Sequence, residues 1–225
     1  MLVAWPTSVE ELVAEQLRLG AAETAVWHPP ELDVLVGGCF VCFERGPSGP
    51  GRPGESGWAG AALVRGGELV ATASATAPAG AIYEAGLLAL REGPLLAAAV
   101  GALPELPDVL LVNATGRDHP RRAGLALHLG AVLGVPTVGV THRPLAAEGE
   151  WPPDETGATS PLVLAGEIVG QWVRTRAGTR PLAVHAAWAT DPDAAARLVL
   201  AATQRARTPE PLRQARRVAR SARSR

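Results

Sequence analysis

The chain of 225 residues contains no lysine, and all 21 of its basic residues are arginine. Alanine, glycine and proline are also abundant, so a coding bias toward GC-rich codons explains the missing lysine without reference to function. The absence still has one chemical consequence. Any reaction that an ancestor carried out with a lysine side chain must now use another residue.

Long apolar runs are absent as well. No run approaches the ~20 residues that a membrane-spanning helix requires. The first residues, MLVAWPTSVEELVAEQ, lack the basic start and apolar core of a secretory leader. We therefore expect no membrane partner and a cytoplasmic location.

Cysteine is scarce, with Cys39 and Cys42 forming a C-x-x-C pair in GGCFVCFERG. A redox pair of this kind places its first thiol at a helix N-terminus, and a zinc site needs further ligands nearby. The flanking residues are instead typical of a strand, where positions three apart point to opposite faces. We interpret both cysteines as packing residues.

Hydrophobic residues make up 47% of the chain, which is enough for one well-buried domain at this length. The net charge of −1 is unevenly distributed: eight Arg and one Glu from residue 203 onward give +7, which leaves −8 for the rest. A basic tail can bind phosphates by releasing counterions, and the alternative is a solvated helix face followed by a frayed end. We assign residues 1–207 to a single domain and 208–225 to an Arg-rich extension.

The apolar periodicity predicts an α/β protein. Helices are expected at residues 8–19, 84–103 (broken at Gly93 and Pro94), 121–133 and 191–207 (capped by Asp191 before Pro192). Strands are expected at 33–43, 61–65, 68–75, 108–112, 137–140, 162–165, 167–175 and 181–184, with Gly/Pro-rich loops at 47–60 and 148–160. Three consecutive strands followed by helix, strand, helix and strand predict a ribonuclease-H-like fold, in which helices flank a mixed central sheet.

Three segments resemble the endonuclease V family, whose members cut nucleic acid one bond beyond a deaminated adenine. They read YEAGLLALREGPLL (83–96), HPRRAGLALHLGAVLGVPTVGV (119–140) and TPEPLRQAR (208–216). The resemblance spans residues 36–217. It implies DNA repair at inosine, with hydrolysis assisted by Mg²⁺ that acidic side chains hold.

The metal-binding positions that the resemblance implies are largely substituted. Phe40 stands where the family has an aspartate in the first strand, and Asn113 stands where a second aspartate ends the central strand. Glu92, in REGP, matches the family glutamate and is the one retained acid, so it is our candidate catalytic and metal-binding residue. Asn113 offers a carbonyl oxygen but no charge. If the protein is active it needs Mg²⁺, and otherwise it needs no cofactor.

Other family positions have changed too. The resemblance implies a lysine where His142 stands, so we name His142 and Asn113 as substituted catalytic positions. An expected histidine aligns with Thr115, and another aligns with Trp188, three residues after His185. Two further acids, Asp118 and Glu44, lie at positions that the fold does not direct at the cleft.

Several family positions implied to contact nucleic acid are retained. Tyr83 and Gly86 match a loop that inserts beside the damaged base, although the proline that stiffens it in the family is missing. The loop before the next helix matches at further positions, with paired hydrogen bonds from arginine to phosphate as the expected contact. These residues are Gly116, His119, Arg121 and Arg122. The alternatives are that His119 caps the following helix, that His142 is an exposed loop residue, and that Glu92 lies on the helix surface or pairs with Arg91 or Arg122.

The sequence thus favours a catalytically impaired or inactive descendant, a pseudoenzyme, that binds DNA or RNA or else a protein partner. One alternative is an active metal-dependent endonuclease acting on inosine-containing DNA or RNA. A second is a fold recruited to a different small-molecule reaction, using polar residues at the carboxyl ends of the strands. Those residues are Glu92, Asn113, Thr115, His119 and His142.

Overall fold

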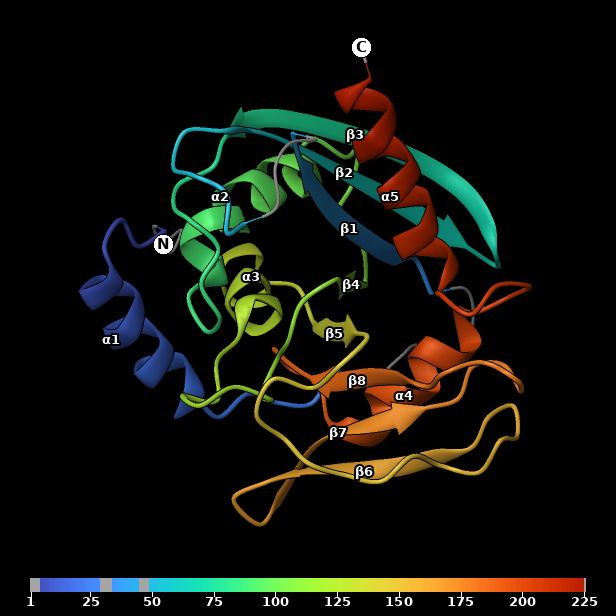
Figure 1. Ribbon diagram of the computed structural model, residues 1–225. Helices are drawn as coiled ribbons and strands as arrows, with labels where there is room; N and C mark the ends of the chain where they lie inside the picture. Colours follow the sequence, from blue (N-terminus) through green and yellow to red (C-terminus); the bar gives the residue numbers. More distant parts are fainter. Residues whose placement is uncertain (1–4, 29–33, 45–48, 225) are drawn as a thin grey trace.

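The computed structural model describes residues 5–28, 34–44 and 49–224. These residues form one mixed sheet in the order β3-β2-β1-β4-β5-β8-β7-β6 (Figure 1). The eight strands are β1 Val36–Phe43, β2 Ser56–Arg65, β3 Glu68–Pro78, β4 Val109–Val112, β5 Thr137–Thr141, β6 Thr159–Leu164, β7 Glu167–Val173 and β8 Leu182–Ala186.

Parallel pairs occupy the centre of the sheet and antiparallel pairs its two sides. Strand β1 pairs antiparallel with β2 and parallel with β4, which pairs parallel with β5. The β5–β8, β8–β7 and β7–β6 pairs are antiparallel. This arrangement confirms the predicted ribonuclease-H-like α/β fold.

Helices cover both faces of the sheet. They are α1 Val9–Gly20, α2 Leu88–Gly101, α3 Leu125–Leu133, α4 Pro192–Ala201 and α5 Glu210–Arg223. The first three share a core with one face of β1, β2 and β4, whereas α4 and α5 pack on the other face (Figure 1). Asp191 caps α4 as predicted, because its carboxylate accepts a hydrogen bond from the Ala194 backbone nitrogen. No helix of the described residues is long and apolar enough to cross a membrane.

The two predicted Gly/Pro-rich loops were partly wrong. Strand β2 already begins at Ser56 and β6 at Thr159, because these residues pair with Pro78 in β3 and Val173 in β7, and local composition does not reveal that pairing. Residues 47–48 of the first loop, and Asp33 at the predicted start of the first strand, lie outside the described residues.

Three helix boundaries also differ from the prediction. Helix α2 begins at Leu88 rather than residue 84 and continues through Pro94, since its buried apolar face outweighs the lost backbone hydrogen bond. Helix α3 begins at Leu125 rather than residue 121, because Arg122 has a φ of 59° that no α-helix accommodates. Helix α4 ends at Ala201 rather than residue 207.

Helix α5 occupies the segment that the sequence set apart as an extension. Its Leu212, Ala215 and Ala219 are buried, and the helix lies across β1 and β2 (Figure 1). The approach is close: a β-carbon at Gly60 would lie 2.6 Å from the Ala219 nitrogen and still nearer the Ala215 carbonyl oxygen. The segment therefore contributes to the core, and in this part of the chain the alternative of a frayed end was wrong.

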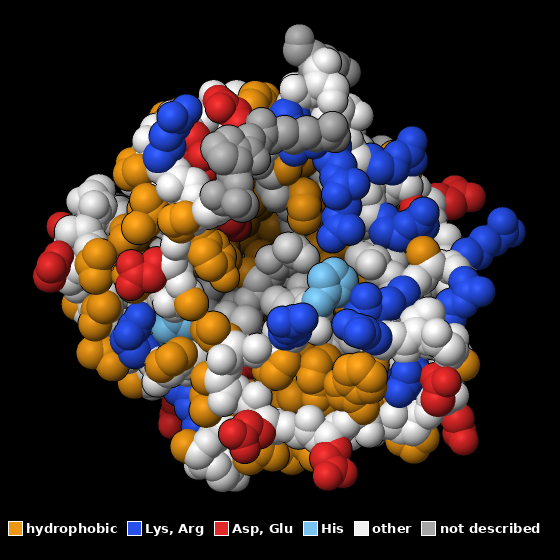
Figure 2. All heavy atoms as spheres, in the orientation of Figure 1, with side chains coloured by type: hydrophobic (Ala, Val, Ile, Leu, Met, Phe, Trp, Pro, Cys, Tyr) orange, Lys and Arg blue, Asp and Glu red, His pale blue; other side chains and the backbone are white. Residues whose placement is uncertain are grey.

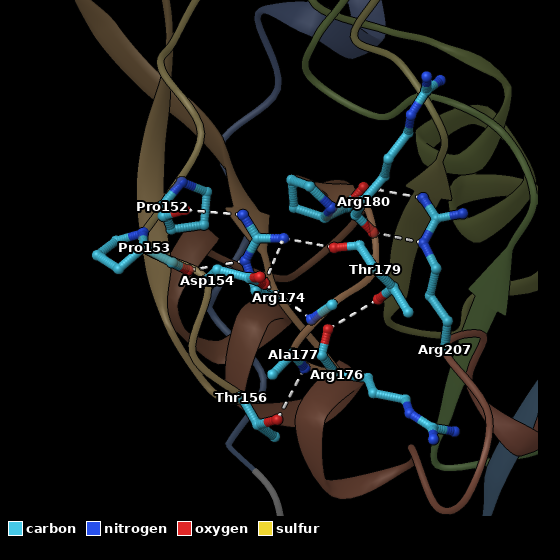
Figure 3. A network of polar contacts seen from close by, with 12 residues as sticks. Pro152, Pro153, Asp154, Thr156, Arg174, Arg176, Ala177, Thr179, Arg180 and Arg207 are labelled. Atoms are coloured by element: carbon cyan, nitrogen blue, oxygen red, sulfur yellow. Dashed lines mark hydrogen bonds and ion pairs between the residues drawn. The ribbon is translucent and has the colours of Figure 1, made fainter.

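A network of arginine contacts fixes the loops that precede β6 and β8 (Figure 3). Arg174 is buried and donates hydrogen bonds to the carbonyl oxygens of Pro152, at 2.9 Å, and Pro153, at 2.7 Å. Arg207, in the connection between α4 and α5, donates to the carbonyl oxygens of Arg180 and Pro181. These contacts hold the start of α5 against the turn that precedes β8.

Candidate functional site

A cavity of about 420 Å³ lies at the carboxyl end of β4 and near the middle of β1. Its walls come from α1, β1, the loop before α2, α2 itself, and the segments after β4 and β5. The polar and aromatic side chains that line it are Gln16, Phe40, Tyr83, Glu84, Glu92, Asn113, Thr115, His119, Thr141 and Arg143.

The three positions that the resemblance implied for metal binding meet in this cavity. Phe40 lies in β1, Asn113 directly follows β4, and Glu92 lies in α2. Phe40 is half-buried and Asn113 is exposed. The fold therefore gathers these positions as predicted, but it gathers an aromatic ring, a neutral amide and one carboxyl group.

Glu92 lines the cavity and pairs with no cation among the residues that the structure describes. Burial raises its pKa from 4.5 to about 8, and the positive charge of Arg91 only partly opposes this shift. Arg91 itself pairs with Glu55, and Arg122 pairs with Glu167 at 3.1 Å. The alternatives of a surface residue or a partner of Arg91 or Arg122 were therefore wrong, and at neutral pH Glu92 is mainly the uncharged acid.

These residues do not fit Mg²⁺. The ion requires several oxygen ligands in octahedral geometry, with carboxylates to supply charge. Among residues 5–28, 34–44 and 49–224, no group of three or more His, Cys, Asp or Glu side chains could hold a metal ion. Cys39 also lines the cavity, but its sulfur is not one of the oxygen ligands that Mg²⁺ requires.

The loop that carries Tyr83 and Gly86 forms one rim of the cavity and is held by hydrogen bonds to its backbone. Gly86 adopts a φ of 84°, which glycine tolerates. Its carbonyl oxygen accepts hydrogen bonds from Gln16 at 2.9 Å, His119 at 3.0 Å and Arg121 at 3.2 Å. Tyr83 remains 55% exposed at this rim. The loop is thus pre-ordered, and its aromatic side chain is free to contact a ligand.

His119 and Arg121 act within the protein. The Nδ1 atom of His119 accepts a hydrogen bond from the Arg121 backbone nitrogen at 3.1 Å. The Nε2 atom therefore carries the ring hydrogen and donates a hydrogen bond to the Gly86 carbonyl oxygen. Burial lowers the pKa of His119, which keeps the ring neutral. Gly124 rather than His119 caps α3, so the capping alternative was wrong.

The remaining predicted contacts lie outside the cavity. Arg122 donates to the Leu164 carbonyl oxygen at 2.8 Å, and Gly116 packs against Ala186 with no room for a β-carbon. His142 is exposed, as one alternative stated, and the positive charges of Arg207 and Arg216 act with burial to lower its pKa. His142 therefore belongs to a cationic surface beside the cavity.

A buried polar chain that the sequence did not predict connects three elements behind the cavity. The Thr141 hydroxyl lies 2.8 Å from His185 Nε2, and His185 Nδ1 lies 3.4 Å from an Asp118 carboxylate oxygen. Asp118 also accepts backbone hydrogen bonds from residues 145–147. Asp118 and His185 are fully buried, so they position the cavity wall and do not rebuild a metal site.

The sequence also missed two side chains near the cavity. Gln16 reaches it from α1, and Arg216 reaches Phe40 from α5, with its guanidinium carbon 4.8 Å from the ring centroid. Gln16 comes from a helix outside the resembling segments, whereas Arg216 is the last residue of the segment 208–216, and no local pattern marks either side chain as a neighbour of the cavity. The excess of arginine near the end of the chain is the one signal that pointed toward Arg216.

Comparisons with known proteins agree with this geometry. The endonuclease V family model matches residues 47–217. The endonuclease V of Methanopyrus kandleri is 47% identical over 132 residues, which are 58% of this chain and 56% of that protein. The endonuclease V of Streptomyces avermitilis is 39% identical over 148 residues, so the chain spans less than two thirds of the length of each of these two relatives. The endonuclease V of Nocardia farcinica is 36% identical over 222 residues, which are 98% of this chain and 95% of that protein.

Solved structures extend the likeness to the whole fold. The endonuclease V of Streptomyces avermitilis superimposes with a TM-score of 0.86 at 33% identity, covering 98% of this chain and 95% of that one. The Ciona intestinalis endonuclease V, solved with DNA containing an inosine, gives a TM-score of 0.76 at 20% identity, covering 96% and 98%. With its sheet order, its gathered family positions and these matches, the chain belongs to the endonuclease V family.

Proposed function

We propose that this protein is a catalytically impaired endonuclease V that binds nucleic acid without cutting it. The observation that carries the proposal is the cavity itself, where Phe40, Asn113 and a largely uncharged Glu92 take the places of a carboxylate cluster. Metal-assisted hydrolysis needs an ion that activates water and neutralises charge on the phosphate. These three side chains supply too little negative charge to bind one.

The retained parts of the site support binding. The cavity volume of about 420 Å³ suits a group the size of a nucleobase, and Tyr83 stands exposed at its rim as a stacking platform. The cationic surface on α5 lies beside it (Figure 2). The Ciona intestinalis relative was solved with inosine-containing DNA, so we infer that such a strand, of DNA or RNA, is the ligand here.

A cleavage and binding assay on matched strands tests the proposal. The purified protein is mixed with short single strands, with and without one inosine, first with Mg²⁺ and then with Mn²⁺. We expect salt-dependent binding measured by fluorescence anisotropy, and intact strands on a denaturing gel. Turnover that is abolished in Glu92→Gln would show an active endonuclease and overturn the proposal, as would a lack of binding at low salt.

A reaction on a small molecule is the second candidate, and one observation favours it. Glu92 has a pKa of about 8 inside a cavity, which is suited to general acid–base catalysis near neutral pH. Asn113, Thr115 and His119 line the same cavity. A nucleoside that binds the cavity, competes with the strands and is converted to product would favour this function over strand binding.

A further inference from the structure

The side chain of Arg216 covers the ring that replaces a family aspartate. Arg216 projects from α5, and its guanidinium carbon lies 4.8 Å from the centroid of Phe40, within the range of a cation–π contact. Phe40 also lines the cavity. A positive charge is therefore held where the resemblance places a carboxylate that binds a metal cation.

No acid neutralises this guanidinium within the described part of the chain. Its neighbours on α5 are engaged: Arg213 pairs with Glu210 at 2.6 Å, and Arg217 donates to Gln214 at 3.2 Å. By contrast, no hydrogen bond or ion pair of Arg216 is found among the described residues, and its Nε atom is buried without a hydrogen-bond partner. A half-buried guanidinium with unused donors is a strong binding site for an anion.

Other arginines surround Arg216. Burial lowers the pKa of Arg216, and the positive charge of the neighbouring Arg220 lowers it further. Together with Arg207 and Arg217, these residues line a groove of about 280 Å³ on α5 and the segment before it. Figure 2 shows arginine side chains gathered at one side of the hollow in this face. An anion in this groove would experience several positive charges at once.

The substitution of aspartate by phenylalanine is what leaves Arg216 free. An aspartate at position 40 would pair with the guanidinium and neutralise it, whereas the aromatic ring contacts the guanidinium and brings no negative charge to it. Phe40 and Arg216 therefore form one unit, with the ring as the support and the guanidinium as the donor.

We propose that Arg216, supported by Phe40, binds a backbone phosphate of the nucleic-acid strand and does so without a divalent metal. The guanidinium takes the place of a metal ion as the positive charge beside the cavity. This inference rests on the proposed binding of nucleic acid. It adds the group that holds the phosphate and the independence from metal.

Neutralising variants on one helix test this site. The affinity for a fluorescein-labelled, inosine-containing single-stranded DNA is measured by anisotropy in EDTA and again in Mg²⁺, for the parent protein, Arg216→Gln, Arg216→Lys and Arg217→Gln. Arg217→Gln is the matched control, because it removes the same charge from an exposed position of the same groove, whereas Arg216 contacts the ring of Phe40. Thermal melts establish that each variant is folded, and Arg216→Lys keeps the charge if Arg216→Gln does not fold.

We expect equal affinity of the parent protein in EDTA and Mg²⁺. Arg216→Gln should lose about tenfold or more, as for a charge-assisted bond, and Arg216→Lys should lose less, because it keeps the charge but not the planar fork. Arg217→Gln should lose about twofold. Equal losses in the two glutamine variants, or a parent affinity that requires Mg²⁺, would overturn this inference alone. A parent protein that binds no strand would overturn the proposed function as well.

Discussion

At the scale of single residues, Glu92 shows how the same side chain changes its chemistry with its surroundings. In a cluster of carboxylates around a metal ion it would be an anion, but beside Phe40 and Asn113 it is enclosed, and no cation pairs with it in the described part of the chain. Desolvation then favours the neutral form and raises its pKa to about 8.

This shift predicts a pH dependence of stability. Because Glu92 ionises with a pKa near 4.5 when unfolded and near 8 when folded, the folded state binds the extra proton between these values. The free energy of unfolding should therefore fall as pH rises from about 4.5 to about 8 and level off above that range. Glu92→Gln should remove this dependence and raise the Tm at pH 9 by roughly 10 °C or more, since a shift from 4.5 to about 8 is worth about 5 kcal/mol and each kcal/mol moves the Tm by about 2–4 °C.

Differential scanning fluorimetry at pH 5 and pH 9 measures the effect. Glu84→Gln is a suitable control, because Glu84 lines the same cavity but is exposed. A gain for Glu92→Gln that is the same at both pH values would contradict the prediction.

Asp118 gives a second prediction at this scale. Its two oxygens accept three backbone hydrogen bonds, from residues 145–147 at 2.6–2.8 Å, in a fully buried site beside His185. Asp118→Asn would turn an amide donor toward backbone donors, so we expect a loss of about 2–4 kcal/mol in the free energy of unfolding. Urea titration measures this loss. Asp108→Asn should cost about 1 kcal/mol or less, since the exposed Asp108 accepts one such bond, from Leu35.

At the scale of elements, α5 has two roles, since it covers part of the sheet and also carries a cationic surface. Its buried side chains cover β1 and β2, and its exposed arginines form the groove that ends at Arg216. A basic segment at the end of a chain is usually taken as an accessory to binding. Here the same helix completes the core.

The close approach of α5 to β2 predicts which changes would displace it. A methyl group at Gly60 would collide with the backbone of α5 near Ala215 and Ala219. We expect Gly60→Ala to cost about 2–3 kcal/mol, as overpacking in a core does, and to weaken strand binding because Arg216 moves with the helix. Gly101→Ala is a suitable control, because a β-carbon at Gly101 meets open space. Gly66→Ala is unsuitable, since Gly66 has a positive φ.

Truncation gives the complementary result. Removing the chain after residue 207 should destabilise the whole domain by exposing β1 and β2, as seen in a lower Tm and increased aggregation. The prediction would be contradicted if the truncated protein kept an unchanged melting curve and only bound nucleic acid less tightly. The segment would then be an extension that serves binding alone.

At the scale of the whole molecule, the question is whether the cavity can be returned to metal chemistry. We expect that neither Phe40→Asp nor Asn113→Asp alone yields cleavage of an inosine-containing strand, because one added carboxylate does not make an octahedral oxygen site. The pair should also fail, since Arg216 would neutralise the carboxylate introduced at position 40. Adding Arg216→Ala to the pair should increase Mg²⁺ affinity, measured by calorimetry on the apo-protein.

The matched comparison in this series is Arg217→Ala in the same double background, because Arg217 lies on the exposed side of α5. Equal Mg²⁺ affinity in the two triple variants would show that Arg216 does not hinder the metal.

The sequence by itself determined the family and the order of most elements, and it predicted which family positions are substituted. Those features rest on local patterns: buried strands such as β4, a capped helix at Asp191, and contiguous motifs along residues 83–96 and 119–140. The start of β2 at Ser56 and the continuity of α2 through Pro94 escaped it, because pairing with β3 stabilises the first and burial of the helix's apolar side chains stabilises the second.

Tertiary structure decided what the site can do. It placed Glu92 in the cavity, where no described cation pairs with it, directed Arg121 and Arg122 to internal carbonyl oxygens, and carried Arg216 from the far end of the chain onto Phe40. The physical reason is that charge and hydrogen bonding depend on which groups meet in space. Residues 40 and 216 are far apart in sequence, and only the packing of α5 across β1 brings them together.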